Sequence, residues 1–209
     1  MRRFGPAAAI AVVFLVAMVL GIANPVRPSS VRTDALGPDN DETAEQYLGR
    51  ASSGSGDGER WALVSFVRSM PAAEVLAVMD GVRVSVVYVH VPLPRVQTPV
   101  IDVAVPDTDV VVARSVRDAA TLVPPGSTER SRAVAAVVRD RLISDCACVA
   151  GVLVRADVAR LSELGADTDV RVLEALPGDA VFGRFAVTPL FPERSGDAAQ
   201  PDDGPVPSS

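Results

Sequence analysis

Apolar and polar residues follow one another along the middle of the chain in blocks that predict alternating strands and helices. Residues 61–67 and 148–154 are apolar at nearly every position and rich in β-branched side chains, which is typical of strands buried on both faces. Residues 72–79 instead repeat apolar side chains every three or four positions, the spacing of a helix with one buried face. The same rules predict further strands at 82–91, 100–105 and 170–176 and further helices at 109–123, 128–144 and 158–165.

Two segments of the chain repeat one order of elements. Residues 61–91 and 147–176 each predict a strand, a short helix, a turn and a second strand that contains Val-Arg-Val. Two such units are typical of the α+β class in its ferredoxin-like, split βαβ form, in which the first strand of each unit lies in the middle of a mixed sheet. The strand at 100–105, which prolines flank, is predicted to be an inserted edge strand, and the helices at 109–123 and 128–144 an inserted pair.

The continuous apolar character of the two central strands requires that both faces of the sheet are covered. In a plain ferredoxin-like sheet the helices cover one face only. The inserted helix pair is the nearest apolar surface that could cover the second face, and a homodimer or a partner protein is the alternative. Residues 182–187 either add a last edge strand or lie over the core.

An apolar run near the N-terminus predicts insertion into a membrane. The residues from Phe4 to Ala23 form an uninterrupted apolar segment after Arg2 and Arg3. Twenty helical residues extend about 30 Å, the thickness of the hydrocarbon core of a bilayer. We expect a single-pass transmembrane signal-anchor over residues 1–23, with the N-terminus in the cytoplasm and the following residues outside the cell membrane. If the segment is cleaved after Ala23, the protein is secreted.

Composition divides the rest of the chain into three parts. Residues 24–58 are rich in Pro, Ser, Gly and acidic residues, which predicts a disordered linker. Residues 195–209 are polar and rich in Pro and Asp, which predicts a disordered tail. Between them, residues 59–194 are long enough to bury the core of one extracytoplasmic α+β domain.

The predicted domain is nearly neutral, and the acidic charge of the chain lies in its flanks. The whole chain has a formal net charge of −6, but residues 59–194 hold 15 Arg against 17 acidic residues. A nearly neutral domain between acidic flanks argues against nucleic acid as a partner. The chain contains no Lys, so all 20 of its basic residues are Arg, which we interpret as the codon bias of a GC-rich genome.

The two cysteines, Cys146 and Cys148, are the candidate site residues. Outside the cytoplasm they could form a local disulfide, stay as buried unpaired thiols or bridge to another chain. Within a strand, side chains two positions apart stand about 7 Å from each other, too far for a disulfide, but a bend at the junction of helix and strand would relieve this. A zinc site would need further ligands, and the sole histidine, His90, is predicted on a distant strand. We predict no metal site and no cofactor.

The sequence contains no nucleophile elbow, Walker motif, dinucleotide fingerprint or metalloprotease helix. His90, near a strand end, is interpreted as a hydrogen-bonded structural residue. We therefore expect a non-enzymatic, membrane-anchored module that binds another protein of the cell envelope or a second copy of itself. The alternatives are a thiol-redox protein that uses Cys146 and Cys148, and a hydrolase in which His90 meets a serine or a carboxylate in a cleft.

Three segments carry a resemblance to a known group of proteins. They are Trp-Ala-Leu-Val-Ser-Phe at 61–66, Tyr-Val-His-Val-Pro-Leu-Pro at 88–94 and Asp-Cys-Ala-Cys at 145–148. Together with the short start and the single anchor, they resemble uncharacterised single-span membrane-anchored proteins of GC-rich Gram-positive bacteria, over residues 59–193. This resemblance implies no activity. More loosely, the helix followed by Val-Arg-Val-Leu-Glu at 170–174 is similar to the ferredoxin-like modules of protease propeptides and of extracytoplasmic division-protein domains, a similarity of fold alone.

Overall fold

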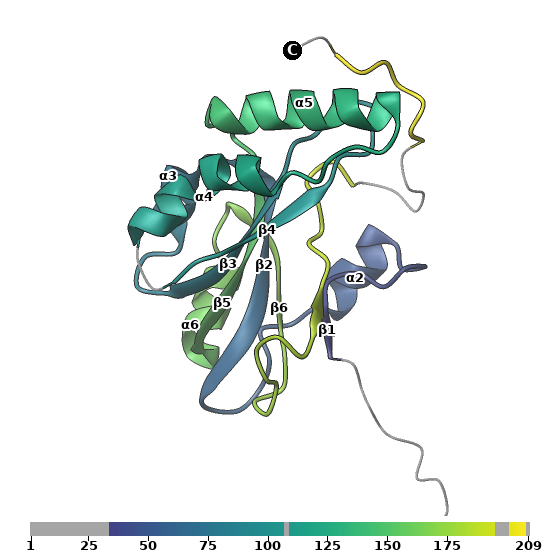
Figure 1. Cartoon of the computed structure of the whole chain (residues 1–209). Helices are drawn as coiled ribbons and strands as arrows, with labels where there is room; N and C mark the ends of the chain where they lie inside the picture. Colours follow the sequence, from purple (N-terminus) through teal and green to yellow (C-terminus); the bar gives the residue numbers. More distant parts are fainter. Residues whose placement is uncertain (1–33, 107–108, 195–200, 208–209) are drawn as a thin grey trace, which may run out of the picture. The chain divides into compact units, whose positions relative to one another are not determined.

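The computed structural model describes residues 34–106, 109–194 and 201–207 (Figure 1). The apolar run of residues 4–23, which the sequence predicts to be an anchor, lies outside these ranges. Within them, no helix combines the length and the apolar character that crossing a bilayer requires.

A five-stranded sheet lies at the centre of the fold. Its strands are β2 (Glu59–Met70), β3 (Arg83–His90), β4 (Val100–Ala104), β5 (Val149–Asp157) and β6 (Val170–Ala175), in the order β4-β3-β5-β2-β6. All four pairings of neighbouring strands are antiparallel, so the prediction of a mixed sheet is wrong for this sheet. The reason is that β5 lies between β2 and β3, which run in the same direction, and separates them. As the sequence predicts, β2 and β5 lie inside the sheet and β4 lies at an edge.

Four helices cover one face of this sheet. They are α3 (Ala72–Val78), α4 (Asp109–Leu122), α5 (Glu129–Ile143) and α6 (Val158–Gly165). Their buried side chains join alternate strand residues such as Val64 and Val152 in the main hydrophobic core. α4 packs against α3, β3 and β4, and α5 lies along α4 (Figure 1). The helix pair, one of the alternatives for covering the second face, therefore does not cover it, because α4 packs against α3, β3 and β4 on the first face and α5 packs against α4.

The second face is covered by the two flanks of the chain. They contribute β1 (Ala35–Leu36), α2 (Ala44–Arg50) and β7 (Ala186–Val187). β1 and β7 pair in parallel as a separate two-stranded sheet, and Leu36 packs with Leu63 and Leu153 of the central strands in a second apolar cluster. Figure 1 shows β1 and α2 on the opposite side of the sheet from α3 and α6. One chain thus covers both faces by itself.

Part of the predicted linker belongs to the folded domain. The prediction of disorder throughout residues 24–58 is wrong for β1 and α2. A capping box begins α2: the Thr43 hydroxyl accepts from the backbone N–H of Gln46, and the Gln46 side chain accepts from the N–H of Thr43. Tyr47 is fully buried against β6. The capped helix α2 and the buried side chain of Tyr47 therefore keep this segment folded although the residues around it are mostly polar.

Part of the predicted tail is folded as well. Residues 201–207, within the tail predicted to be disordered at 195–209, pack against the loop before β4 and the start of α5. Asp202 and Asp203 form ion pairs with two Arg side chains, and Val206 packs against the main core. The tail is polar in composition, but its acidic residues find basic partners on the domain.

Candidate functional site

The two cysteines are joined in a disulfide, with their Cα atoms 5.3 Å apart. Both precede β5, which begins at Val149, so the spacing of side chains within a strand does not apply to them. Asp145 has a left-handed backbone with φ of 58°, which bends the chain directly after α5, and Asp tolerates this conformation better than most residues. Of the alternatives for Cys146 and Cys148, the local disulfide is the one that forms, and the interpretation as unpaired thiols is wrong.

The disulfide lies beside β3 and is accessible from one side. The backbone N–H of His90 donates to the carbonyl of Cys148 at 2.8 Å, so the expectation that the histidine is distant from the cysteines is wrong. Cys148 is only 3% exposed, whereas Cys146 is half-buried. A thiolate from solution would therefore reach the sulfur of Cys146 first.

His90 is the centre of a polar cluster at the end of β3. Its Nε2 lies 2.9 Å from the hydroxyl oxygen of Thr98. Its Nδ1 lies 2.9 Å from Oε1 of Glu193, a close contact that lacks the alignment of a linear hydrogen bond. The imidazole ring also stacks on Phe191, with ring centroids 4.2 Å apart. The prediction that His90 is hydrogen-bonded is thus confirmed at Nε2, and its Nδ1 faces a carboxylate.

The cluster contains the residue types of a hydrolase triad, but the hydrogen-bond roles are reversed. The Thr98 hydroxyl lies 2.7 Å from the carbonyl oxygen of Val91. A carbonyl can only accept, so the single proton of Thr98 goes to Val91, and Nε2 of His90 has to donate to Thr98. A base that donates to a hydroxyl cannot take its proton. We therefore interpret Thr98, His90 and Glu193 as contacts that hold the C-terminal segment against the sheet, and not as a nucleophile with its base.

Arg171 of β6 also holds the C-terminal segment against the sheet. Its guanidinium donates to the carbonyls of Phe191 at 2.8 Å and Arg194 at 2.8 Å. Burial alone would raise the pKa of the Glu193 carboxyl, but the contact with His90, a backbone N–H and the positive charge of Arg171 outweigh burial and hold that pKa below its ordinary value. The carboxylate form of Glu193 is therefore the form that the folded cluster favours.

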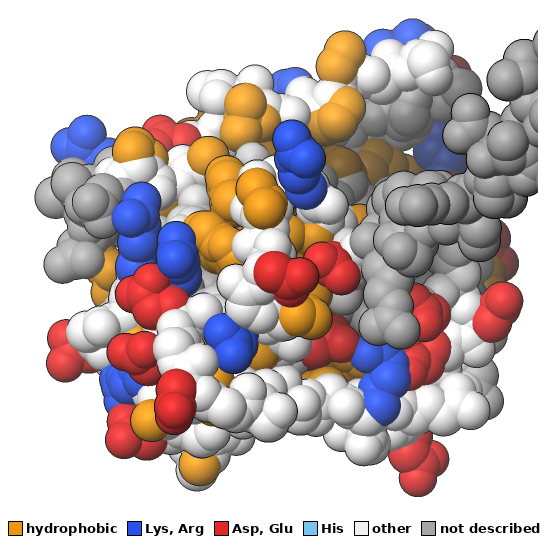
Figure 2. Space-filling model, turned by 90° about the horizontal axis from the view of Figure 1, so that it is seen from below, with side chains coloured by type: hydrophobic (Ala, Val, Ile, Leu, Met, Phe, Trp, Pro, Cys, Tyr) orange, Lys and Arg blue, Asp and Glu red, His pale blue; other side chains and the backbone are white. Residues whose placement is uncertain are grey.

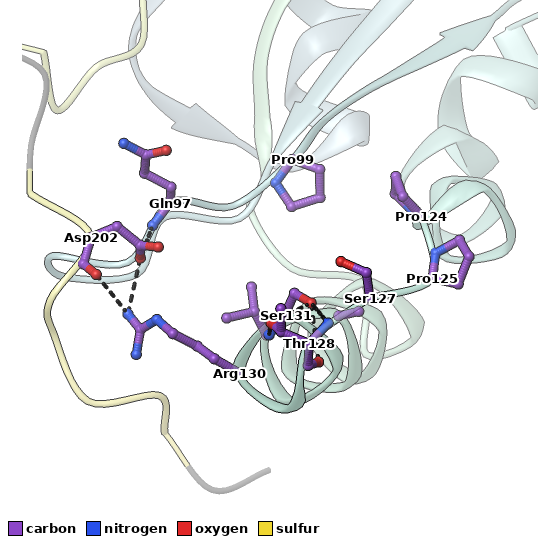
Figure 3. A pocket seen from close by; sticks show the side chains of 12 residues that line it. Gln97, Pro99, Pro124, Pro125, Ser127, Thr128, Arg130, Ser131 and Asp202 are labelled. Atoms are coloured by element: carbon purple, nitrogen blue, oxygen red, sulfur yellow. Dashed lines mark hydrogen bonds and ion pairs between the residues drawn. The ribbon is translucent and has the colours of Figure 1, made fainter.

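An open pocket of about 290 Å³ lies between the loop before β4 and the N-terminus of α5 (Figure 3). Pro99 lines one side, and Pro124 and Pro125 line another. Its charged lining residues, Arg130 and Asp202, pair with each other at 2.9 Å. The lining contains neither histidine nor cysteine, so this pocket does not join the two groups that the sequence singled out.

Apolar side chains are exposed at the end of the sheet where β2 begins. We call this surface the aromatic patch, and it comprises Trp61, Val181, Phe182 and Phe185. The ring centroid of Trp61 lies 5.0 Å from that of Phe182 and 6.2 Å from that of Phe185. Val181 is 55% exposed and Phe182 51%. The guanidinium of Arg155 lies 5.5 Å from the ring centroid of Trp61. Figure 2 looks at the molecule from below and shows apolar side chains exposed between Arg and acidic ones.

The course of the chain after β6 explains the aromatic patch. The N–H of Leu176 donates to the carbonyl of Trp61 at 2.8 Å, so the loop leaves the sheet next to that ring. Gly183 has φ of 78°, a conformation that glycine adopts at no steric cost. This turn brings Phe182 and Phe185, on either side of the glycine, to the same tryptophan.

Sequence reasoning missed the aromatic patch and the partners of His90. Two aromatic residues in a loop that contains Gly178, Asp179 and Gly183 could have indicated an exposed apolar surface, because such loops are usually polar. Glu193 and Thr98 carry no comparable signal. Glu193 meets His90 because the C-terminal segment brings it to the end of β3, and Thr98 meets His90 because the loop between β3 and β4 folds back beside that strand end.

No family assignment assists the functional argument. Comparison of the chain with protein-family models, with curated proteins and with solved structures finds no match. In the described ranges, no group of three or more His, Cys, Asp and Glu side chains lies close enough to hold a metal ion. The function therefore has to be inferred from the surface and the contacts of the chain itself.

Proposed function

We propose that this protein is a membrane-anchored, extracytoplasmic module of the cell envelope that binds another protein and is not an enzyme. The aromatic patch carries the proposal. Phe182 is 51% exposed although it lies in a cluster of three aromatic rings. Aromatic and Arg side chains are the residues that contribute most at the centres of protein interfaces. A partner that covers Phe182 would remove this apolar surface from water.

The remaining parts of the proposal concern the fold and the membrane. The strand order β4-β3-β5-β2-β6, with two strand-helix-strand units around β2 and β5, supports a ferredoxin-like fold with an inserted edge strand and helix pair. The apolar run at residues 4–23 supports a single-pass anchor. The resemblance to anchored proteins of GC-rich Gram-positive bacteria agrees with the anchor.

Two observations favour binding over hydrolysis. The Thr98 hydroxyl gives its proton to a backbone carbonyl, which leaves His90 as a donor to it. His90 is also only 9% exposed and lies under Phe191, so a substrate would have to displace the C-terminal segment to reach the imidazole.

Site-specific photo-crosslinking tests the proposal. A photoreactive side chain replaces Phe182 in the full-length chain in its own membrane. The matched control carries the same group at Leu122, which is 52% exposed at the end of α4. We expect one discrete heavier product from position 182, containing the same second protein in every replicate and lost when Val181→Asp is added. Equal products at both positions, or no product at 182, would contradict the proposal. A product of twice the chain mass would show a homodimer instead.

The disulfide favours a second candidate function, that of a thiol-redox protein. A partner dithiol would attack the sulfur of Cys146, release the Cys148 thiolate, and leave as a disulfide while Cys146 and Cys148 become two thiols. Quenching cells with acid and alkylating before and after reductant tests this idea. A redox protein in use shows both the reduced and the disulfide form, whereas a single, fully disulfide-bonded form in every growth condition would refute the redox function.

A further inference from the structure

The C-terminal residues 201–207 lie beside the open pocket, against a surface that we call the groove and that comprises Arg95, Gln97 and Arg130. Asp203 makes two contacts with the guanidinium of Arg95, one from Nε to Oδ1 at 2.8 Å and one from Nη2 to Oδ2. Asp202 Oδ1 accepts from Nη2 of Arg130 at 2.9 Å and from the backbone N–H of Gln97 at 3.0 Å. Figure 3 shows Asp202 between Gln97 and Arg130. Each of the two acidic side chains therefore meets its own Arg.

The backbone of the same segment is recognised as well. The N–H of Gly204 donates to the carbonyl of Arg95 at 2.7 Å, and Gly204 is buried. A Cβ atom on Gly204 would lie 2.5 Å from the carbonyl oxygen of Pro94 and 2.8 Å from that of Arg95. Only glycine fits at this point, so the groove selects for a residue type as well as for charge.

The domain presents the groove through fixed backbone features. Arg95 lies at the tip of a turn closed by a bridge between Leu93 and Val96, and its φ is 55°. Arg130 lies in the first turn of α5, which the capping box of Thr128 fixes. Two residues after the glycine, Val206 packs against the main core. The groove thus recognises the pattern Asp-Asp-Gly-x-Val.

We propose that this groove is a binding site for acidic peptide segments of the Asp-Asp-Gly-x-Val type on a partner protein, and that the chain's own C-terminal segment occupies it until such a segment displaces it. The ion pairs involved are exposed, with side-chain exposures of 59% for Arg95 and 57% for Asp203. Exposed ion pairs contribute little each, so the segment in place is held chiefly by its attachment to the same chain and can exchange. The groove and the aromatic patch are different surfaces, and neither proposal rests on the other.

The variant Gly204→Val tests the proposal in the full-length chain, because its side chain would collide with the backbone of the groove and displace the segment. The control is Gly49→Val, since an added Cβ at Gly49 meets nothing within 4 Å. The probe is a fluorescein-labelled peptide of residues 201–207, and fluorescence anisotropy measures its binding. We expect the Gly204→Val chain to bind the peptide at least fivefold more tightly than the unaltered and Gly49→Val chains. Adding Arg95→Ala to the Gly204→Val chain should reduce that binding at least fivefold.

Further variants test the same site if the first variant does not fold. If Gly204→Val fails to fold, the double change Asp202→Asn and Asp203→Asn removes both ion pairs at exposed positions and should favour exchange of the segment for the peptide, although less than a clash with the backbone would. A probe with the same two Asn substitutions should bind the Gly204→Val chain more weakly than the unaltered probe does. Equal affinity of the peptide for all chains, or equal binding of the Asn-substituted peptide, would overturn the proposal. A concentration-dependent dimer that Gly204→Val abolishes would show that the segment fills the groove of a second copy, which would overturn its placement within one chain.

Discussion

Truncation of Tyr47 tests whether the N-terminal flank is part of the folded domain. Tyr47 is fully buried and packs with Val172 of β6 and with Leu190 of the C-terminal segment. Removal of a buried aromatic side chain costs about 3–5 kcal/mol of the free energy of unfolding, because it removes buried apolar area and leaves a cavity. In a domain of this size, each kcal/mol shifts the melting temperature by about 2–4 °C. We therefore expect Tyr47→Ala to lower the melting temperature by roughly 6 to 20 °C.

The next residue of the same helix supplies the control. Leu48 is 39% exposed, so Leu48→Ala should cost less than about 1 kcal/mol. Thermal unfolding of the full-length chain, followed by circular dichroism, measures both changes. Hydrogen exchange of the α2 amides should accelerate with Tyr47→Ala and stay slow with Leu48→Ala. Equal, small effects of the two substitutions would refute the reasoning, because a true linker would tolerate both.

Three further predictions concern a turn, a carboxylate and the disulfide. Gly37→Ala should lower the free energy of unfolding by about 1–3 kcal/mol or more, as measured by chemical denaturation. The reason is that φ at Gly37 is 105° and the added Cβ would lie 1.8 Å from a carbonyl oxygen. The control Gly49→Ala has open space around the added Cβ, so it should be neutral or stabilising. The lowered pKa of Glu193 means that its carboxylate stabilises the fold above the ordinary value of 4.5 and that this contribution is lost as the pH falls through the lowered value. Stability of Glu193→Gln should therefore fall less between pH 5 and 3, as an acid titration of unfolding would show, and parallel acid limbs would contradict this. Cys146 and Cys148 should resist alkylation in the folded chain until reductant is added, each then gaining one alkyl group by mass, and alkylation without reductant would exclude the disulfide.

The strands and helices of the central domain are readable from sequence because their signals are local. Apolar runs and periodic apolar positions predict β2, α3, α5 and β6 close to where they lie. The strand order follows from the repeated unit, which predicts that β2 and β5 lie inside the sheet. The prediction of a mixed sheet was wrong because the two strands of each unit are separated by a strand of the other unit. Such pairing between distant segments cannot be read from a local sequence pattern.

The cover of the second face could not be predicted from composition. It depends on isolated apolar residues within polar stretches, above all Leu36, Tyr47 and Leu190. Averages over the flanks hide such residues, although the pattern Thr-x-x-Gln at Thr43 and Gln46 was a readable start of a helix.

The chemical groups of the candidate site could be predicted from the sequence, but their arrangement could not. The sequence identifies the cysteines and His90 as chemical groups, and a bend before β5 was the condition for a local disulfide. The left-handed backbone of Asp145 supplies that bend. The contact of His90 with Glu193 could not be predicted, because Glu193 lies far away along the chain and on no regular element.

Labelling of intact cells tests the central claim that the domain lies outside the cytoplasm. The chain contains no Lys, so the single substitution Arg114→Lys on the exposed surface of α4 introduces one side-chain amine into the domain. A membrane-impermeant amine-reactive reagent is applied to whole cells and to lysed cells, and the peptide around residue 114 is quantified by mass spectrometry, with the unaltered chain as the control. We predict the same extent of labelling before and after lysis. Labelling that occurs only after lysis would contradict the account.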